Sequence, residues 1–153
     1  MQLEYKKNKS IFFSFKKLST VFFENYTVSY ISLKAKEKNN YFGSFKDNKF
    51  NPKLEAKITE KIWKEIPSNF IEAKLGNYSF TENSFSAIVT IDCRVSEEAT
   101  KKLMPKIIAS FKARSTILLN QLHGKHGRVF WENCYKEEAI SDLKQLNEVL
   151  KRL

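Results

Sequence analysis

Alternating apolar and polar residues predict three strands in this chain. Residues 26–36 place Val28 and Tyr30 on one side and Ile31 and Leu33 on the other. Branched and aromatic side chains at a period of two are typical of a pleated strand, so we predict a central strand here. Two further alternating runs are joined only by residues 81–84, which predicts an antiparallel pair. These runs extend from Ile71 to Phe80 and from Phe85 to Cys93.

Apolar residues recur every three or four positions in two segments, which predicts two helices. The first begins at Asn51-Pro52, with Asn as the cap and Pro at the first helical position, and ends at Pro67. The second follows a Ser96 cap and runs to about Leu122, with Pro105 marking either a kink or a later start. The expected inner residues are Leu54, Ile58, Ile62 and Trp63 in the first helix, and Leu103, Ile107, Ile108, Phe111, Ile117 and Leu118 in the second.

The remaining segments complete an α+β pattern. Residues 41–50 predict a small hairpin with a turn at Asp47-Asn48, residues 129–135 a last strand, and residues 141–153 a terminal helix. Residues 1–24 mix lysine clusters with Phe and Ile, which suits an edge strand or an arm. The order predicts a ferredoxin-like or RRM-like antiparallel sheet with two main helices packed on one face, plus a C-terminal helix. A chain of 153 residues fits one domain spanning residues 1–153.

The net charge of +10 favours a polyanionic partner. From Ala99 to Trp131 the chain carries seven lysines and arginines and no acidic residue, which a salt-bridged surface does not explain. The alternative is a solvated helix face that only maintains solubility. The candidates for contact with a nucleic-acid backbone are Lys101, Lys102, Lys106, Lys112, Arg114, Lys125 and Arg128.

The two cysteines, Cys93 and Cys134, form no disulfide framework and belong to no CxxC or Cys/His cluster, so neither a structural zinc site nor any other cofactor is expected. A reduced, cytoplasmic setting fits this usage. Residues 11–23 are apolar and aromatic, but Lys16 and Lys17 interrupt them, which argues against a signal peptide or a membrane span.

Several landmarks in order resemble the REP-associated tyrosine transposases, a branch of the single-tyrosine HUH transposases. The resemblance spans roughly Tyr26 to the C-terminus, and each landmark alone is weak. The landmarks are a Tyr-x-Val strand from Tyr26, Tyr41-Phe42-Gly43, a helix with Ile58 and Trp63 before Pro67, Ser110-Phe111-Lys112, and Trp131 before Tyr135.

In that family, two strand histidines and a residue of the terminal helix hold a divalent metal, and a tyrosine on that helix attacks the scissile phosphate. The resemblance aligns Ser84 and Ser86 with the two histidines and Arg152 with the tyrosine, and the third ligand would fall beyond Leu153. A neutral hydroxyl does not replace imidazole as a metal ligand. The resemblance therefore implies a domain that does not cut DNA by this route.

Other chemical candidates are weaker. Tyr135 is a substitute nucleophile only if a divergent enzyme survives, and its family counterpart looks structural. His123 and His126 lie in a glycine-flanked loop without a nearby carboxylate, which favours exposed or phosphate-contacting histidines over a metal site. Three aromatic residues are candidates either for base stacking or for the core: Tyr41, Phe42 and Trp131.

Three functional hypotheses follow. The first is a catalytically inactive, transposase-like protein that binds hairpin or single-stranded DNA, as the resemblance implies. The second is an active divergent transposase that uses Tyr135. The third is a protein-interaction module whose arm, residues 11–23, docks on a partner or on a second copy, and a homodimer is compatible with the resemblance.

Overall fold

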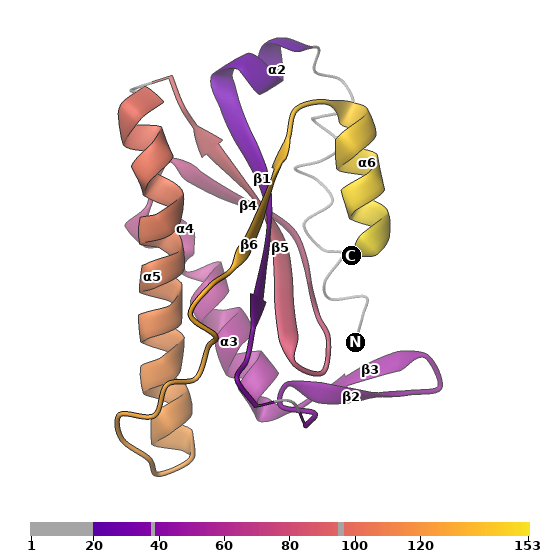
Figure 1. The fold of residues 1–153 in the computed structure, drawn as a ribbon, viewed down its shortest axis with the longest axis vertical. Coiled ribbons are helices and arrows are strands. Elements are labelled where there is room, and N and C mark those ends of the chain that lie inside the picture. Colours follow the sequence, from indigo (N-terminus) through magenta and orange to yellow (C-terminus); the bar gives the residue numbers. More distant parts are fainter. Residues whose placement is uncertain (1–19, 38, 95–96) are drawn as a thin grey trace.

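The computed structural model describes residues 20–37, 39–94 and 97–153. Its main sheet is antiparallel and has the strand order β4-β5-β1-β6 (Figure 1). The strands are β1 (Tyr26–Lys34), β4 (Ala73–Phe80), β5 (Ser84–Asp92) and β6 (Lys136–Ile140). The first strand lies between the third and the fourth main strand, which is the predicted ferredoxin-like arrangement, so the predicted fold class is confirmed.

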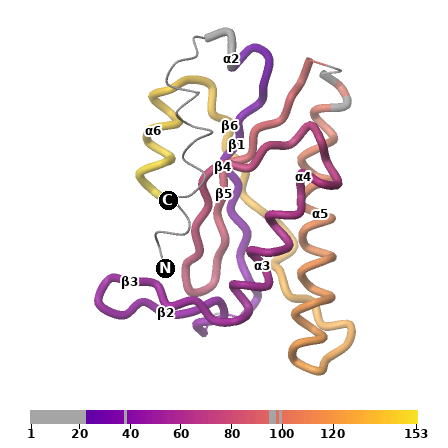
Figure 2. Tube along the Cα trace, turned by 180° about the vertical axis from the view of Figure 1, so that it is seen from behind, coloured from indigo at the N-terminus to yellow at the C-terminus, as the bar shows by residue number. Residues whose placement is uncertain are grey.

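Helices cover both faces of this sheet, and the two main helices share one of them. Helices α3 (Leu54–Lys64), α4 (Ile66–Asn69) and α5 (Glu97–Leu122) lie on one side, and α6 (Leu143–Arg152) lies on the other, as the two opposite views show (Figures 1 and 2). A short helix, α2 (Thr20–Asn25), precedes β1. The rest of the predicted N-terminal arm, residues 1–19, lies outside the described residues.

An aromatic cluster fills the space between the sheet and the pair α3 and α5. Trp63 and Phe111 meet at a ring-centroid distance of 5.1 Å, and Phe111 lies 5.6 Å from Trp131. Phe85 on β5 contacts Trp63 and Phe111 from the sheet side. All four rings are buried, so truncation of any one is expected to cost about 3–5 kcal/mol.

The predicted hairpin is present as a separate two-stranded ribbon. Strand β2 (Gly43–Lys46) pairs with β3 (Lys49–Pro52), and the turn residues Asp47 and Asn48 have φ of 53° and 60°. Positive φ at both central residues is typical of the type I′ turn that matches strand twist. At the base of the ribbon, a Cβ on Gly43 would lie 2.2 Å from the Asn51 carbonyl oxygen, so only glycine fits there.

The predicted start of the first main helix is wrong. Asn51 and Pro52 end strand β3, and α3 begins at Leu54 with Lys53 as its N-cap. Asn51 pairs with Ser44 across the ribbon, so the residue that was predicted to cap the helix is part of strand β3.

The predicted last strand is also wrong. Residues 129–135 contribute only one bridge, between Trp131 and Ala35, and the strand follows at Lys136–Ile140. The neighbouring residues Phe130 and Trp131 are buried in the same aromatic cluster, whereas successive side chains of a strand point to opposite faces. Glu137 and Glu138 lie on β6.

Helix α5 differs from the prediction in two details. Pro105 lies inside the helix, so the later start is wrong, while the Ser96 cap falls outside the described residues. Ile117 was expected on the inner face but is 57% exposed, and Leu119 is buried instead. Leu54 of α3 is exposed as well.

Candidate functional site

The central strand β5 separates two differently built faces of the sheet. Phe85, Ala87 and Val89 pack into the aromatic core beneath α3 and α5. Ile88 packs on the opposite face, in a cluster with Leu146 and Val149 of α6. Because side chains alternate along a strand, Ser84 and Ser86 lie on the same side as Ile88, the α6 side.

The hydroxyls of Ser84 and Ser86 are both engaged by neighbouring hydroxyls. Ser86 is 9% exposed, and its Oγ lies 3.0 Å from the Oγ of Ser32, its partner across β1. The Oγ of Ser84 lies 2.5 Å from the Oγ1 of Thr81. Such neutral oxygens do not fit a divalent metal centre of the histidine type. Within the described part of the chain, no three His, Cys, Asp or Glu side chains converge as a metal site would require.

Arg152 lies on the same side of the sheet as the two serines. Its guanidinium carbon is 4.9 Å from the ring centroid of Tyr30, and its Nη2 donates to the Oε2 of Glu138 at 2.9 Å. This hydrogen bond raises the pKa of Arg152 above its usual value. The end of α6 is thereby attached to β1 and β6. The structure therefore brings together on one face the three positions that sequence analysis had aligned with the catalytic groups.

Tyr135 lies on the other face. Its ring packs against the aromatic core, and the Lys112 Nζ lies 5.9 Å from its centroid. Burial, and then the neighbouring Glu137 carboxylate, raise the pKa of its hydroxyl. A raised pKa disfavours the phenolate that attacks a phosphate, and the sheet separates this hydroxyl from Ser84 and Ser86.

Three of the seven predicted basic residues are partly buried and make contacts within the protein. Lys112 Nζ donates to the carbonyl oxygen of Glu132 at 2.9 Å, and burial lowers the pKa of this lysine. Arg114 forms an ion pair with Glu65, at the end of α3. Arg128 lies 3.5 Å from Glu37, and its backbone carbonyl accepts from Asn120.

The other four predicted basic residues are exposed lysines: Lys101, Lys102, Lys106 and Lys125. Lys102 and Lys106 are four residues apart and therefore share one face of α5. Lys102 makes one loose ion pair with Glu98 at 3.8 Å. The 26 residues of α5 span ~39 Å at 1.5 Å per residue, so Lys125, beyond its C-terminus, lies far from the other three. Three of the four lysines therefore lie together near the start of α5, and the fourth lies beyond its far end.

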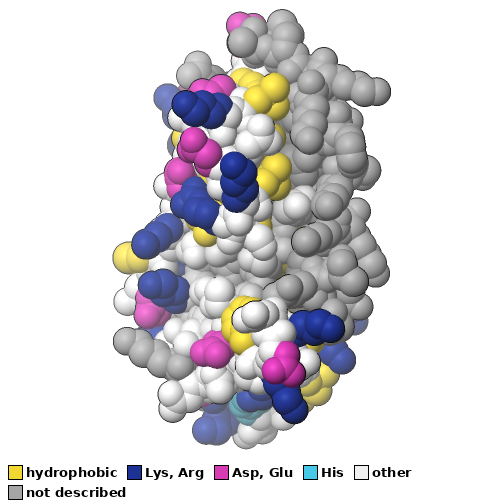
Figure 3. Space-filling view, turned by 90° about the vertical axis from the view of Figure 1, so that its right-hand side faces the viewer, with side chains coloured by type: hydrophobic (Ala, Val, Ile, Leu, Met, Phe, Trp, Pro, Cys, Tyr) yellow, Lys and Arg dark blue, Asp and Glu magenta, His cyan; other side chains and the backbone are white. Residues whose placement is uncertain are grey.

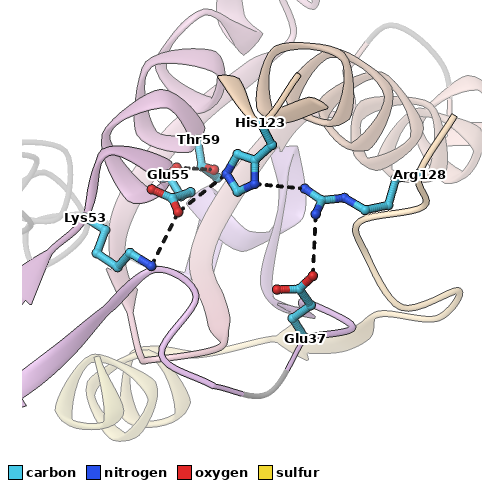
Figure 4. Close-up of polar contacts among 6 residues, drawn as sticks. All are labelled: Glu37, Lys53, Glu55, Thr59, His123 and Arg128. Carbon is cyan, nitrogen blue, oxygen red and sulfur yellow. Dashed lines mark hydrogen bonds and ion pairs between the residues drawn. The ribbon is translucent and has the colours of Figure 1, made fainter. Parts of the chain in front are cut away.

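A polar cluster that sequence analysis missed joins three segments at the end of the molecule where α5 terminates (Figure 4). Glu55 on α3 is buried, and its Oε2 lies 3.5 Å from Lys53 Nζ and 3.6 Å from His123 Nε2. His123 Nδ1 lies 3.3 Å from Arg128, which reaches Glu37 beyond β1. No local pattern marks Lys53, Glu55 or Glu37 as partners, because the cluster forms only when the three segments meet.

The predicted loop histidines have different surroundings, and the expectation that no carboxylate lies near them is wrong for His123, which faces Glu55. His123 stacks on Tyr41 at a centroid distance of 6.0 Å and is mostly covered, whereas His126 is exposed. Burial is the largest of the effects that raise the pKa of Tyr41. Three residues had been candidates for either base stacking or the core, and burial of all three assigns them to the core: Tyr41, Phe42 and Trp131.

The α6 side of the molecule carries charges of both signs. Figure 3 shows the Lys and Arg side chains of this side interspersed with Asp and Glu side chains. Arg152 with Glu138 is one such pair. Among the described side chains of this side, interspersed charges give a weaker field for a polyanion than lysines alone.

No helix of the described ranges is both long enough and apolar enough to cross a membrane. Neither a protein-family model nor a curated protein sequence matches this chain. A solved structure of a REP-associated tyrosine transposase bound to a REP hairpin is similar in fold, with a TM-score of 0.51 and 8% sequence identity. The similarity covers 80% of this chain and 61% of that one, so this chain spans about three fifths of the transposase's length. The chain therefore has a transposase-like fold, and its relationship to the REP-associated tyrosine transposases is a distant one of fold.

Proposed function

We propose that this protein binds hairpin or single-stranded DNA and does not cut it by histidine–metal chemistry. The observation that carries the proposal is the pair Ser84 and Ser86 on β5. The two hydroxyls occupy one face of a transposase-like sheet and are bonded to Thr81 and Ser32. The scaffold of a DNA-processing enzyme is thus combined with side chains that supply no metal ligand.

The absence of this catalytic route follows from the chemistry of the side chains on the α6 face. Arg152 stands where the resemblance expects a tyrosine, and a guanidinium remains protonated and is not a nucleophile. It is also held by Glu138 and Tyr30. The hydroxyl of Tyr135 lies on the opposite face, so it does not restore the missing group.

Binding is supported by charge and by fold. The net charge of +10 raises the local concentration of polyanions around the protein. Three exposed lysines lie near the start of α5 and Lys125 lies beyond its other end, so ammonium groups flank a helix ~39 Å long, about the length of an 11-base-pair stem. The solved structure of similar fold holds a REP hairpin, which agrees with a DNA ligand for this chain as well.

The test compares two triple substitutions of equal charge by fluorescence anisotropy. The first replaces Lys101, Lys102 and Lys106 with Gln. The matched control replaces exposed lysines of the α6 side, namely Lys136, Lys144 and Lys151, with Gln. Each lost phosphate contact reduces the magnitude of the slope of log affinity against log salt by about 1. The slope of the first variant is therefore expected to be smaller by about 3, and that of the control to change much less.

Two results would contradict the proposal in distinct ways. Failure of the unaltered protein to bind either a hairpin or an unpaired oligonucleotide would contradict DNA binding itself. Equal losses in the two triple variants would contradict the assignment of the contacts to α5.

A further inference from the structure

We propose that the β2–β3 ribbon is a second DNA-contacting element that inserts into the major groove of a duplex stem. This inference rests on the proposed function and deepens it, because it assigns recognition of paired DNA to the ribbon and leaves non-specific attraction to phosphates to the other lysines. The ribbon comprises Gly43–Lys46 and Lys49–Pro52, and it projects from the lower end of the molecule in both Figure 1 and Figure 2.

The two faces of the ribbon differ in chemistry. Phe45 lies opposite Phe50, and Lys46 lies opposite Lys49. Phe50 is buried in the core and contacts Phe45 at a ring-centroid distance of 5.2 Å, so the aromatic face is the one attached to the body. Alternation places both lysines on the other face, and both are exposed.

The lysine pair is unfavourable in the isolated protein. Like charges directly opposite each other across two strands destabilise the pairing. Asp47 is the acidic residue of the turn, yet no ion pair joins it or any other described acidic side chain to Lys46 or Lys49. A polyanion between or beside the two ammonium groups would relieve their repulsion. This arrangement argues for a phosphate-bearing partner over an apolar one.

The shape of the ribbon favours paired DNA. The major groove of B-form DNA is about 12 Å wide and admits a two-stranded ribbon. The type I′ turn at Asp47-Asn48 fixes the register, so the two lysines are presented at a defined separation. Asn51 and Ser44 form the next pair on the same face and add hydrogen-bonding groups behind the lysines. An unpaired strand offers no groove and would gain nothing from this rigid geometry.

Binding is measured with two labelled probes, a DNA hairpin with a stem of about 12 base pairs and an unpaired oligonucleotide of the same length. The test variant carries Lys46→Gln and Lys49→Gln. The control carries Lys57→Gln and Lys61→Gln, two exposed lysines on α3. We expect the test variant to bind the hairpin roughly ten-fold more weakly than the unaltered protein does. The magnitude of its slope of log affinity against log salt on the hairpin should fall by about 2, and its affinity for the unpaired probe should change little. The control should bind both probes as the unaltered protein does.

A second variant separates binding from folding. Lys46→Glu places opposite charges across the ribbon and should stabilise it, so the unfolding midpoint should not fall. The same change should weaken stem binding more than Lys46→Gln does. Equal weakening on both probes, or no weakening in any ribbon variant, would overturn the inference. If the unaltered protein bound neither probe, both the inference and the proposed function would be overturned. The titration of the unaltered protein therefore separates this outcome from a failure of the ribbon inference alone.

Discussion

Trp131 offers a stringent test of whether the aromatic landmarks of the sequence serve the core or bind bases. Its indole Nε1 donates to the Oγ of Ser115 at 2.9 Å, and both residues are buried. Ser115 in turn donates to the carbonyl oxygen of Phe111 at 2.7 Å. The replacement Trp131→Phe removes the hydrogen bond and leaves a small void, while Ser115 keeps its own acceptor.

The expected cost is the sum of these two effects. A lost hydrogen bond is worth about 1 kcal/mol and the smaller ring about 1–2 kcal/mol, giving about 2–3 kcal/mol in the free energy of unfolding. Ser115→Ala leaves the buried indole N–H without an acceptor, for about 1–3 kcal/mol. The double variant should be more stable than additivity predicts by about 1 kcal/mol, because the shared hydrogen bond is lost only once.

Urea unfolding of the four proteins in this cycle measures the coupling, and anisotropy titration with DNA measures binding. A core role predicts the stated coupling and unchanged DNA affinity in the absence of urea. A base-stacking role would cost about 1–3 kcal/mol of binding per base. Lost affinity without lost stability, or a coupling below about 0.3 kcal/mol, would refute the core assignment.

Three further predictions concern individual side chains. Replacing Lys112 with Gln should make residues 132–135 more susceptible to proteolysis. It should weaken DNA binding less than Lys106→Gln does, and a larger loss of affinity than that of Lys106→Gln would show that Lys112 contacts DNA. Incubation with Mg²⁺ or Mn²⁺ and labelled single strands should give no covalent adduct on a denaturing gel, and an adduct abolished by Tyr135→Phe would restore the divergent-enzyme hypothesis. The Arg94 hydrogen bonds lower the pKa of Asp92 to about 2, so this pair stabilises the fold above pH ~4 and the stabilisation is lost as the pH falls towards 2. Arg94→Gln should flatten that decline in acid-unfolding curves, and an unchanged curve would contradict this reasoning.

The sheet was predictable because alternation reports local burial. Residues of β1 and β5 carry apolar side chains at a period of two, and β4 does so on either side of a bulge between Leu75 and Tyr78. The pairing of β4 with β5 follows from their short connection. The last strand was not predictable by the same reasoning. The first four positions of Lys136–Ile140 are exposed and the first three are charged, and the segment is a strand because it pairs with β1 at the edge of the sheet. The apolar residues before it, Phe130 and Trp131, instead pack side by side in the core.

The candidate site was predictable only in part, for a similar reason. The spacing of Ser84 and Ser86 gives their shared face directly, since residues two apart on a strand point the same way. The contacts of Arg114 with Glu65 and of His123 with Glu55 depend on which segments meet after folding. A count of basic residues therefore does not show which of them make contacts within the protein.

The most direct test of the central claim is a titration of a labelled DNA hairpin with an unpaired flank between about 50 and 200 mM salt. If the protein holds DNA through exposed lysines, log affinity should fall linearly with log salt. The four lysines at the ends of α5 give a slope of about −4, and the two ribbon lysines would add about −2. Absent binding, or an affinity that does not change with salt, would contradict the account.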